Sequence, residues 1–137
     1  MLDFIKKHEG CKLKAYKDTE GVWTIGFGNI YINGRRVISS DRITQSQADL
    51  MLKEHCEKYV YPILGHFLWL NDNQKRALAS LIYNCGDLKR KCPSLWKALE
   101  TKDYKQIYKQ WDYGLKNGLF TRRSEELALF FKYPYKV

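Results

Sequence analysis

Apolar residues recur at helical spacing in the first nine residues and again throughout the second half of the chain. Leu2, Ile5 and Glu9 fall on one face of a short first helix, for which Gly10 is a natural stop. Later segments with the same periodicity follow residues that favour helix N-caps. They predict helices from Thr44 to about Tyr61, with Pro62 at or past the end, from Asn71 to Cys85, from Pro93 or Ser94 to Glu100, from Asp103 to Trp111, and from Thr121 to a point before Pro134.

Residues 13–38 instead show the short alternation of apolar and polar positions that is typical of strands. Three strands are predicted, Leu13–Lys17, Val22–Phe27 and Ile30–Ile32. Asn33-Gly34 is a strong signal for a two-residue hairpin turn, which leads into the extended segment Arg35–Ile38. The order of elements predicts an α+β chain in which a small antiparallel sheet precedes an all-helical half.

Length and composition are those of one folded domain that is large enough for two lobes. The chain has 137 residues, of which 45% are hydrophobic and 15% are aromatic, so it can bury a substantial core. No apolar run approaches the roughly 20 residues that cross a bilayer. The N-terminus also lacks the apolar stretch and cleavage site of a secretory signal. We therefore expect no membrane insertion and no signal peptide.

The net charge of +9 favours an anionic partner, which could be nucleic acid, anionic lipid or a cell-wall polymer. Basic residues are spread along the chain, with small clusters at Lys89-Arg90-Lys91 and Arg122-Arg123. Because the chain has no arginine-rich tail and no nucleic-acid-binding motif, we expect no specific nucleic-acid partner.

The cysteines and histidines do not have the spacing of a metal site. We therefore expect neither a metal nor a cofactor. Free, buried thiols in a reducing compartment are the favoured interpretation of the cysteines, and a disulfide between Cys85 and Cys92 stays an alternative. The four cysteines are Cys11, Cys56, Cys85 and Cys92.

Two carboxylates near the N-terminus are candidates for acid–base chemistry. Glu9 would leave the last turn of the first helix on its apolar side, where burial favours the protonated carboxyl. Asp18 lies in the turn-forming segment Lys17–Gly21, which should be wetter and favour ionisation. One protonated and one ionised acid is the combination that glycosidic bond cleavage needs. Ordinary surface carboxylates are the alternative, but the surrounding glycines and Thr24 favour the functional interpretation.

Two arginines are predicted in the first turn of the last helix, where the helix dipole disfavours cations by about 0.3–1 kcal/mol each. Glu125 and Glu126 follow one turn later and offset part of this cost. Arg122 and Arg123 are therefore interpreted either as members of surface ion pairs or, for Arg122, as a cation directed at a catalytic carboxylate or an acidic substrate.

The segment Glu9–Gly28 reads E-G-x-x-L-K-x-Y-K-D-T-E-G-x-x-T-I-G-x-G and resembles the bacteriophage-type lysozymes, glycoside hydrolase family 24. Weaker matches follow at Tyr83–Asp87, at Ser94-Leu95 and at Arg122-Arg123 with Glu126. The resemblance implies a lysozyme-like α+β fold with a three-stranded antiparallel sheet, a long connecting helix and an all-helical C-terminal lobe. Lobe 1 would cover residues 10–60 approximately, lobe 2 residues 61–137, and the helix of residues 1–9 would pack on lobe 2, with the cleft between the lobes.

The resemblance also implies hydrolysis of the β-1,4 bond between N-acetylmuramic acid and N-acetylglucosamine in peptidoglycan, with inversion and cell lysis. Glu9 would be the general acid, Asp18 would stabilise the transition state from the opposite face of the sugar, and Thr24 would hold the attacking water. The substrate-binding residues would be Ile30, Tyr83 and Ser94, and Arg122 would neighbour Glu9.

Asn29 departs from the family pattern, which often has histidine at this position as a structural partner. We expect a monomeric endolysin that is made in the host bacterial cytoplasm and reaches the wall after release. Two alternatives stay open at this point: a lytic transglycosylase, which would need no activated water, and a non-catalytic basic module that binds the cell wall.

Overall fold

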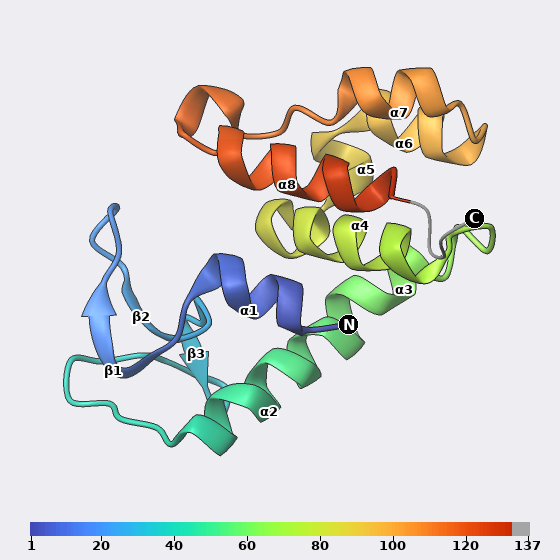
Figure 1. Cartoon of the computed structure of the whole chain (residues 1–137). Coiled ribbons are helices and arrows are strands. Elements are labelled where there is room, and N and C mark those ends of the chain that lie inside the picture. Colours follow the sequence, from blue (N-terminus) through green and yellow to red (C-terminus); the bar gives the residue numbers. More distant parts are fainter. Residues whose placement is uncertain (133–137) are drawn as a thin grey trace. The chain divides into compact units, whose positions relative to one another are not determined.

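Residues 2–57 form the first of two units into which the chain divides in the computed structural model, which describes residues 1–132. This unit begins with helix α1 (Asp3–Glu9), which ends at Gly10 as the sequence predicts. Four short strands and helix α2 follow (Figure 1). The strands are β1 (Lys12–Lys17), β2 (Trp23–Gly26), β3 (Tyr31–Ile32) and β4 (Arg35–Arg36), and α2 covers Gln45–His55.

The strands form two separate antiparallel pairs, so the predicted three-stranded sheet is wrong in its strand count. β1 pairs with β2, and β3 pairs with β4 through the predicted turn at Asn33-Gly34. β2 ends at Gly26, whose φ of 66° turns the chain back. Ile25 and Asn29 then exchange both backbone hydrogen bonds at 2.8 Å. This tight turn keeps the following strand away from β2.

The other edge of β1 is covered by the segment that leads into α2, which the sequence did not indicate. The Ala15 amide donates to the Asp41 carbonyl at 3.0 Å, and the Ile43 amide donates to the Leu13 carbonyl at 2.9 Å. Asp41 itself is held by Arg35, whose two terminal nitrogens donate to its carboxylate at 2.8 and 2.9 Å. An isolated bridge between Lys14 and Arg42 completes the pairing of this segment with β1.

Helix α2 begins as predicted, because Thr44 and Gln47 form a reciprocal capping box. The single helix predicted to end at about Tyr61 is divided, because α2 itself ends at His55. Instead the chain continues through a π-helical turn, Cys56–Val60, into helix α3 (Tyr61–Leu64). Proline is tolerated in the first turn of a helix, where its missing N–H has no intrahelical acceptor. Pro62 occupies such a position in α3, which explains why the helical path extends beyond it.

The second unit contains Met1 and the chain from Lys58 onwards, and its described residues are all helical or irregular. Asn71 caps α4 and Asp103 caps α7, as predicted. Helix α4 packs against α8, and α6 packs against α7 (Figure 1). The helices after α3 are α4 (Asp72–Cys85), α5 (Leu88–Lys91), α6 (Pro93–Glu100), α7 (Tyr104–Gln110), the 3-10 helix η2 (Leu115–Asn117) and α8 (Phe120–Phe130).

Three details of this unit differ from the sequence-based expectation. The single-turn helices α5 and η2 were not predicted. Thr121 does not cap α8, since the helix already starts at Phe120 and its N-cap, Leu119, makes no side-chain cap bond. The chain enters the helix from Gly118 in a left-handed conformation, which sets the start earlier. Helix α8 ends at Phe130, and Pro134 lies outside the described residues.

A buried charge network joins α4, α8 and Trp111. Glu126 is 0% exposed and Arg123 only 1%, so the predicted surface pairing of Arg123 is wrong. The Arg123 side chain lies 2.6 Å and 2.9 Å from the two Glu126 oxygens. The Trp111 indole donates to the same carboxylate at 3.1 Å. The Ser80 hydroxyl donates to it as well, at 2.5 Å. Arg122 bonds the Ser80 carbonyl at 3.1 Å and approaches Glu126 at 3.5 Å.

We expect Glu126→Gln to lower the free energy of unfolding by about 3–5 kcal/mol, because it removes the negative charge that the buried Arg123 side chain binds. Urea denaturation of the full chain measures this loss. Trp111→Phe is the control, since it removes one donor from Glu126 and keeps the ion pair with Arg123, so it should cost much less. Equal losses of unfolding free energy in the two variants would contradict the conclusion that the negative charge of Glu126 stabilises this unit.

A second prediction concerns acid stability. Bonds from the Arg35 side chain, and then from the Ile38 amide, hold the pKa of Asp41 at about 2, below its usual 3.8. The stability that Asp41 contributes is therefore present above pH 3.8 and is lost as the pH falls toward 2. In Asp41→Asn, the free energy of unfolding should therefore fall less between pH 3.8 and 2 than in the wild type. Urea unfolding at each pH measures this dependence. Glu54→Gln, at an exposed site, is the control and should keep the wild-type dependence.

Candidate active site

Glu9 is the last residue of α1, and its carboxylate lies against the backbone of Gly28. The Gly10 amide closes the helix on the Lys6 carbonyl at 3.0 Å, so Glu9 leaves the final turn half-buried. A Cβ atom at Gly28 would stand 3.4 Å from Glu9 Oε1. Gly28 has a φ of 92°, a conformation that side-chain-bearing residues rarely adopt. The glycine therefore permits a close approach between this loop and the acid.

Asp18 follows the last residue of β1 and heads the turn to β2. Its Oδ1 atom accepts hydrogen bonds from the amides of Glu20 and Val22, both at 2.9 Å. Its own amide donates to the Val22 carbonyl at 3.0 Å. Among the residues that the structure describes, no hydrogen bond falls on Oδ2. The turn thus fixes the carboxylate through one oxygen and leaves the other available to a ligand.

Thr24 lies on β2 and is 3% exposed. Its hydroxyl donates to the Val22 carbonyl at 2.9 Å. Its cross-strand partner is Tyr16 on β1, and directly opposed residues place their side chains on the same face of a sheet. Thr24 and Tyr16 therefore share one face of the hairpin that carries Asp18 at its turn.

Tyr16 connects the two acids and was missed by the sequence reasoning. Burial, and then the negative charges of Glu9 and Asp18, raise the pKa of the Tyr16 hydroxyl. Both carboxylates therefore lie within electrostatic range of this group, which stays protonated and able to donate a hydrogen bond. The alternation along β1, which places Tyr16 two residues before Asp18 on the same face, was the signal that could have identified it.

The other predicted residues divide between the two units. Ile30 belongs to the first unit and is half-buried, and its carbonyl accepts from the Val37 amide at 3.0 Å. Tyr83 is half-buried on α4, Ser94 is exposed near the start of α6, and Arg122 is buried on α8, all in the second unit. The roles that the resemblance gives these residues, including that of Arg122 beside Glu9, stay predictions.

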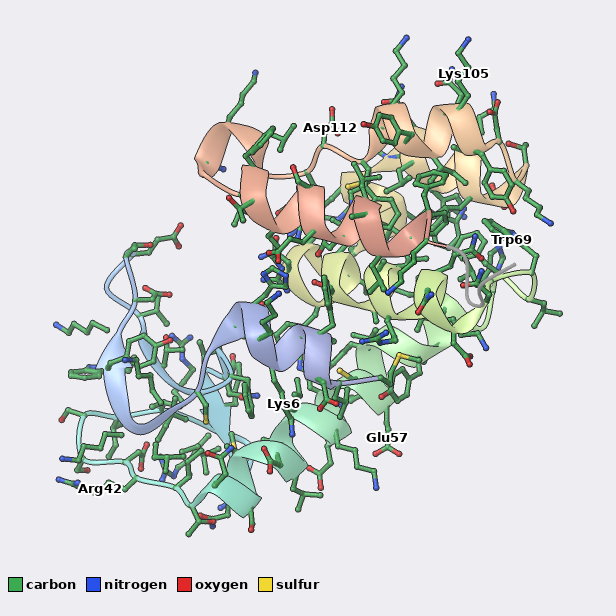
Figure 2. All side chains as sticks on the ribbon, in the orientation of Figure 1. Lys6, Arg42, Glu57, Trp69, Lys105 and Asp112 are labelled. Atoms are coloured by element: carbon green, nitrogen blue, oxygen red, sulfur yellow. The ribbon has the colours of Figure 1, made fainter. Side chains whose placement is uncertain are left out.

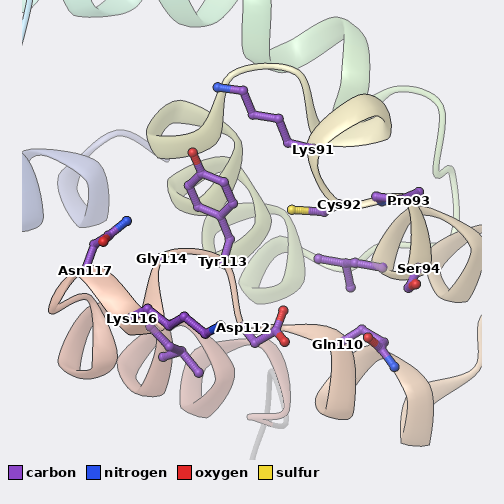
Figure 3. A pocket seen from close by; sticks show the side chains of 12 residues that line it. Lys91, Cys92, Pro93, Ser94, Gln110, Asp112, Tyr113, Gly114, Lys116 and Asn117 are labelled. Carbon is purple, nitrogen blue, oxygen red and sulfur yellow. The ribbon is translucent and has the colours of Figure 1, made fainter.

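Ser94 borders a pocket of about 400 Å³ in the second unit, which Figure 3 shows from close by. Lys91, Asp112 and Lys116 supply charged groups around it, and the pocket lies between the start of α6 and the segment 110–117. Among residues 1–132, no group of three or more His, Cys, Asp or Glu side chains is arranged to hold a metal ion. The pocket therefore combines charged side chains with apolar ones such as Pro93 and Leu95.

Comparison with known proteins identifies relatives along nearly the whole chain. A family model described as phage lysozyme matches residues 6–126. The chain is 34% identical to the endolysin of Salmonella phage P22 over 134 residues, covering 92% of this chain and 91% of the relative. It is 33% identical over 141 residues to the endolysin of Acyrthosiphon pisum secondary endosymbiont phage 1, covering 94% and 93%.

Solved structures agree with this result. An endolysin from Escherichia coli O157:H7 phage FAHEc1 superimposes with a TM-score of 0.85 at 28% identity, covering 99% of this chain and 93% of the other. A mutant of P22 lysozyme gives a TM-score of 0.78 at 30% identity, covering 96% and 94%. These neighbours confirm the predicted lysozyme-like α+β fold class.

We expect Gly28→Ala to reduce hydrolysis of purified peptidoglycan, because the added methyl group would contact Glu9 Oε1 and the strained backbone would shift beside the acid. Gly34→Ala is a matched control: its φ of 78° is also positive, but nothing lies within 4 Å of the new atom. Both variants should lose about 1–2 kcal/mol of stability through backbone strain, and only Gly28→Ala should lose turnover at a temperature where both are folded. A similar loss of turnover in Gly34→Ala would contradict this explanation.

Proposed function

Because this chain belongs to the phage lysozyme family, a family of glycoside hydrolases that act on peptidoglycan, we propose that it hydrolyses the β-1,4 bond between N-acetylmuramic acid and N-acetylglucosamine. The proposed products have an inverted configuration at the new reducing end. The observation that carries this proposal is the arrangement of Glu9, Asp18 and Thr24 around Tyr16 within the first unit.

Glu9 is the proposed general acid. It donates its proton to the glycosidic oxygen as the bond to the sugar breaks, so that the leaving group departs as a neutral alcohol. The Gly28 backbone beside Glu9 Oε1 restricts the positions that the carboxyl group can adopt. A positioned acid of this kind contributes about 10²–10⁴-fold to the rate.

Asp18 and Thr24 are proposed to hold and activate the attacking water. The Thr24 hydroxyl uses its hydrogen on the Val22 carbonyl, but its oxygen can still accept a hydrogen bond from water. Asp18 has an oxygen that accepts no bond from the described protein residues, so it can take a water hydrogen as the general base. An inverting mechanism needs this water on the face opposite the acid, with the two carboxyl groups about 6.5–9.5 Å apart.

The charge of the chain suits an anionic wall polymer. The net charge is +9, and exposed basic side chains such as Arg42 and Lys105 occur in both units (Figure 2). Among the described residues, no helix has the length and apolar character needed to cross a bilayer. The proposed biological role is that of a monomeric endolysin, made in the host bacterial cytoplasm and active on the wall after release, where it causes lysis.

The test is mass spectrometry of the fragments released from purified peptidoglycan, with NMR of freshly formed ends to assign their configuration. The wild-type chain should release fragments with N-acetylmuramic acid at the reducing end and inverted configuration. Glu9→Gln should lower the rate by about 10²–10⁴-fold because it cannot donate the acidic proton. Asp18→Asn should also lower it strongly, since the amide cannot accept a proton from water.

Glu20→Gln is the matched control. Glu20 is an exposed carboxylate two residues from Asp18, and it binds Asp18 through its backbone amide, which the substitution keeps. The Glu20→Gln variant should release fragments at the same rate as the wild type. Fragments with 1,6-anhydro ends would contradict hydrolysis and show that the chain is a transglycosylase. Tight binding to the wall without release of fragments would show that it is a non-catalytic binding module.

A further inference from the structure

The second unit contains a pair of neighbouring thiols that the proposed reaction does not use. Cys85 is the last residue of α4, and Cys92 lies between α5 and α6. Only the single-turn helix α5 separates them along the chain, and a side-chain hydrogen bond between the two thiols contributes to the pKa shift of each. None of the chain's four cysteines forms a disulfide in this structure, so the pair is a reduced dithiol.

The two thiols differ in exposure and in charge environment. Cys85 is 2% exposed, whereas Cys92 is partly exposed. The hydrogen bond from Cys85 lowers the pKa of Cys92, with further help from Arg123 and Lys91 and against burial and Asp112. The same bond, together with burial, raises the pKa of Cys85. Cys92 is therefore the sulfur that is more readily ionised, and the thiolate is the nucleophilic form.

Cys92 is also the thiol that small molecules can reach. It forms part of the wall of the 400 Å³ pocket, between Lys91 and Pro93 (Figure 3). Lys91 and Lys116 contribute positive charge to this pocket. A small anionic disulfide can therefore approach Cys92 from solvent, whereas Cys85 is buried and does not line the pocket.

We propose that Cys85 and Cys92 form a reactive dithiol that is oxidised by low-molecular-weight disulfides such as glutathione disulfide. Cys92 is the attacking sulfur and Cys85 the resolving sulfur. The product is an intramolecular disulfide that ties the end of α4 to the start of α6. This inference rests on the second unit alone and does not depend on the proposed hydrolase activity.

The reaction has two exchange steps. First, the Cys92 thiolate attacks one sulfur of glutathione disulfide, which forms a Cys92–glutathione bond and releases one glutathione thiolate. Cys85 then loses its proton to solvent and attacks the Cys92 sulfur, which forms the Cys85–Cys92 bond and releases the second thiolate. The protein loses two protons and two electrons, and one glutathione disulfide takes up both electrons and becomes two glutathione molecules after the released thiolates bind protons.

Peptide mapping of the oxidised full-length chain tests the pairing. The reduced protein is treated with glutathione disulfide, its remaining thiols are blocked, and it is digested with trypsin without reductant. Cleavage after Arg76, Lys89, Lys91 and Lys97 places the two cysteines on different peptides. The expected result is a disulfide-linked pair of peptides, residues 77–89 and 92–97, that separates on reduction.

Two variants distinguish the roles of the sulfurs. Cys85→Ser keeps a hydroxyl donor beside Cys92 but removes the resolving thiol, so one glutathione should stay attached to Cys92. Cys11→Ser removes a half-buried cysteine of the other unit and should still give the linked peptides. Absence of the linked pair in the wild type, a link that involves Cys11 or Cys56, or glutathione that stays on wild-type Cys92 would each overturn the proposal.

The unfolding temperature gives an independent readout of the bond between α4 and α6. A disulfide that closes a short loop constrains the unfolded chain, so oxidation should raise the unfolding midpoint by roughly 5–10 °C. Dithiothreitol should reverse the rise, and Cys92→Ser should show none. An oxidised, correctly linked protein whose midpoint equals that of the reduced form would overturn the inference that the bond ties the two helices together.

Discussion

A carboxylate withdrawn from water must find hydrogen-bond donors, and the helical unit is arranged around the donors that Glu126 finds. Its oxygens meet groups from α4, from α8 and from Trp111. Burial raises the pKa of Glu126, while Arg123 is the strongest influence in the opposite direction. Two arginines at the start of α8 oppose the helix dipole, but the buried negative charge within one turn of them outweighs this small cost.

The number of donors also separates structural from reactive carboxylates in this chain. Both oxygens of Glu126 are occupied by protein groups, so a substrate has no access to them. Asp41 is similarly held at both oxygens by Arg35. Asp18 differs, because backbone amides orient it through Oδ1 while Oδ2 accepts no bond from the described residues. A group that is fixed and yet has an available oxygen is suited to bind a water molecule.

The sequence predicted what depends on neighbours along the chain and failed where distant residues decide. Helix starts at Thr44 and Asn71 were predicted because each capping box lies within four residues. The motif that carries Glu9 and Asp18 is similarly local. Burial of Glu126 was not predictable, since its partner Ser80 lies 46 residues away. The alternation along β1 places Tyr16 on the same face as Asp18, but its interaction with Glu9 depends on where the end of α1 lies, which the sequence does not show.

Arg123 links the buried carboxylate to the thiol pair, so the two features share one charge balance. It binds Glu126 directly, and its positive charge also favours the thiolate of Cys92 by lowering the pKa of that group. Desolvation, by contrast, lowers the pKa of Arg123 itself, so this cation depends on nearby negative charge. A disulfide carries no charge, so after oxidation Arg123 keeps Glu126 as its bound carboxylate. The close ion pair at 2.6 Å lets the unit accept oxidation without exposing an unpaired charge.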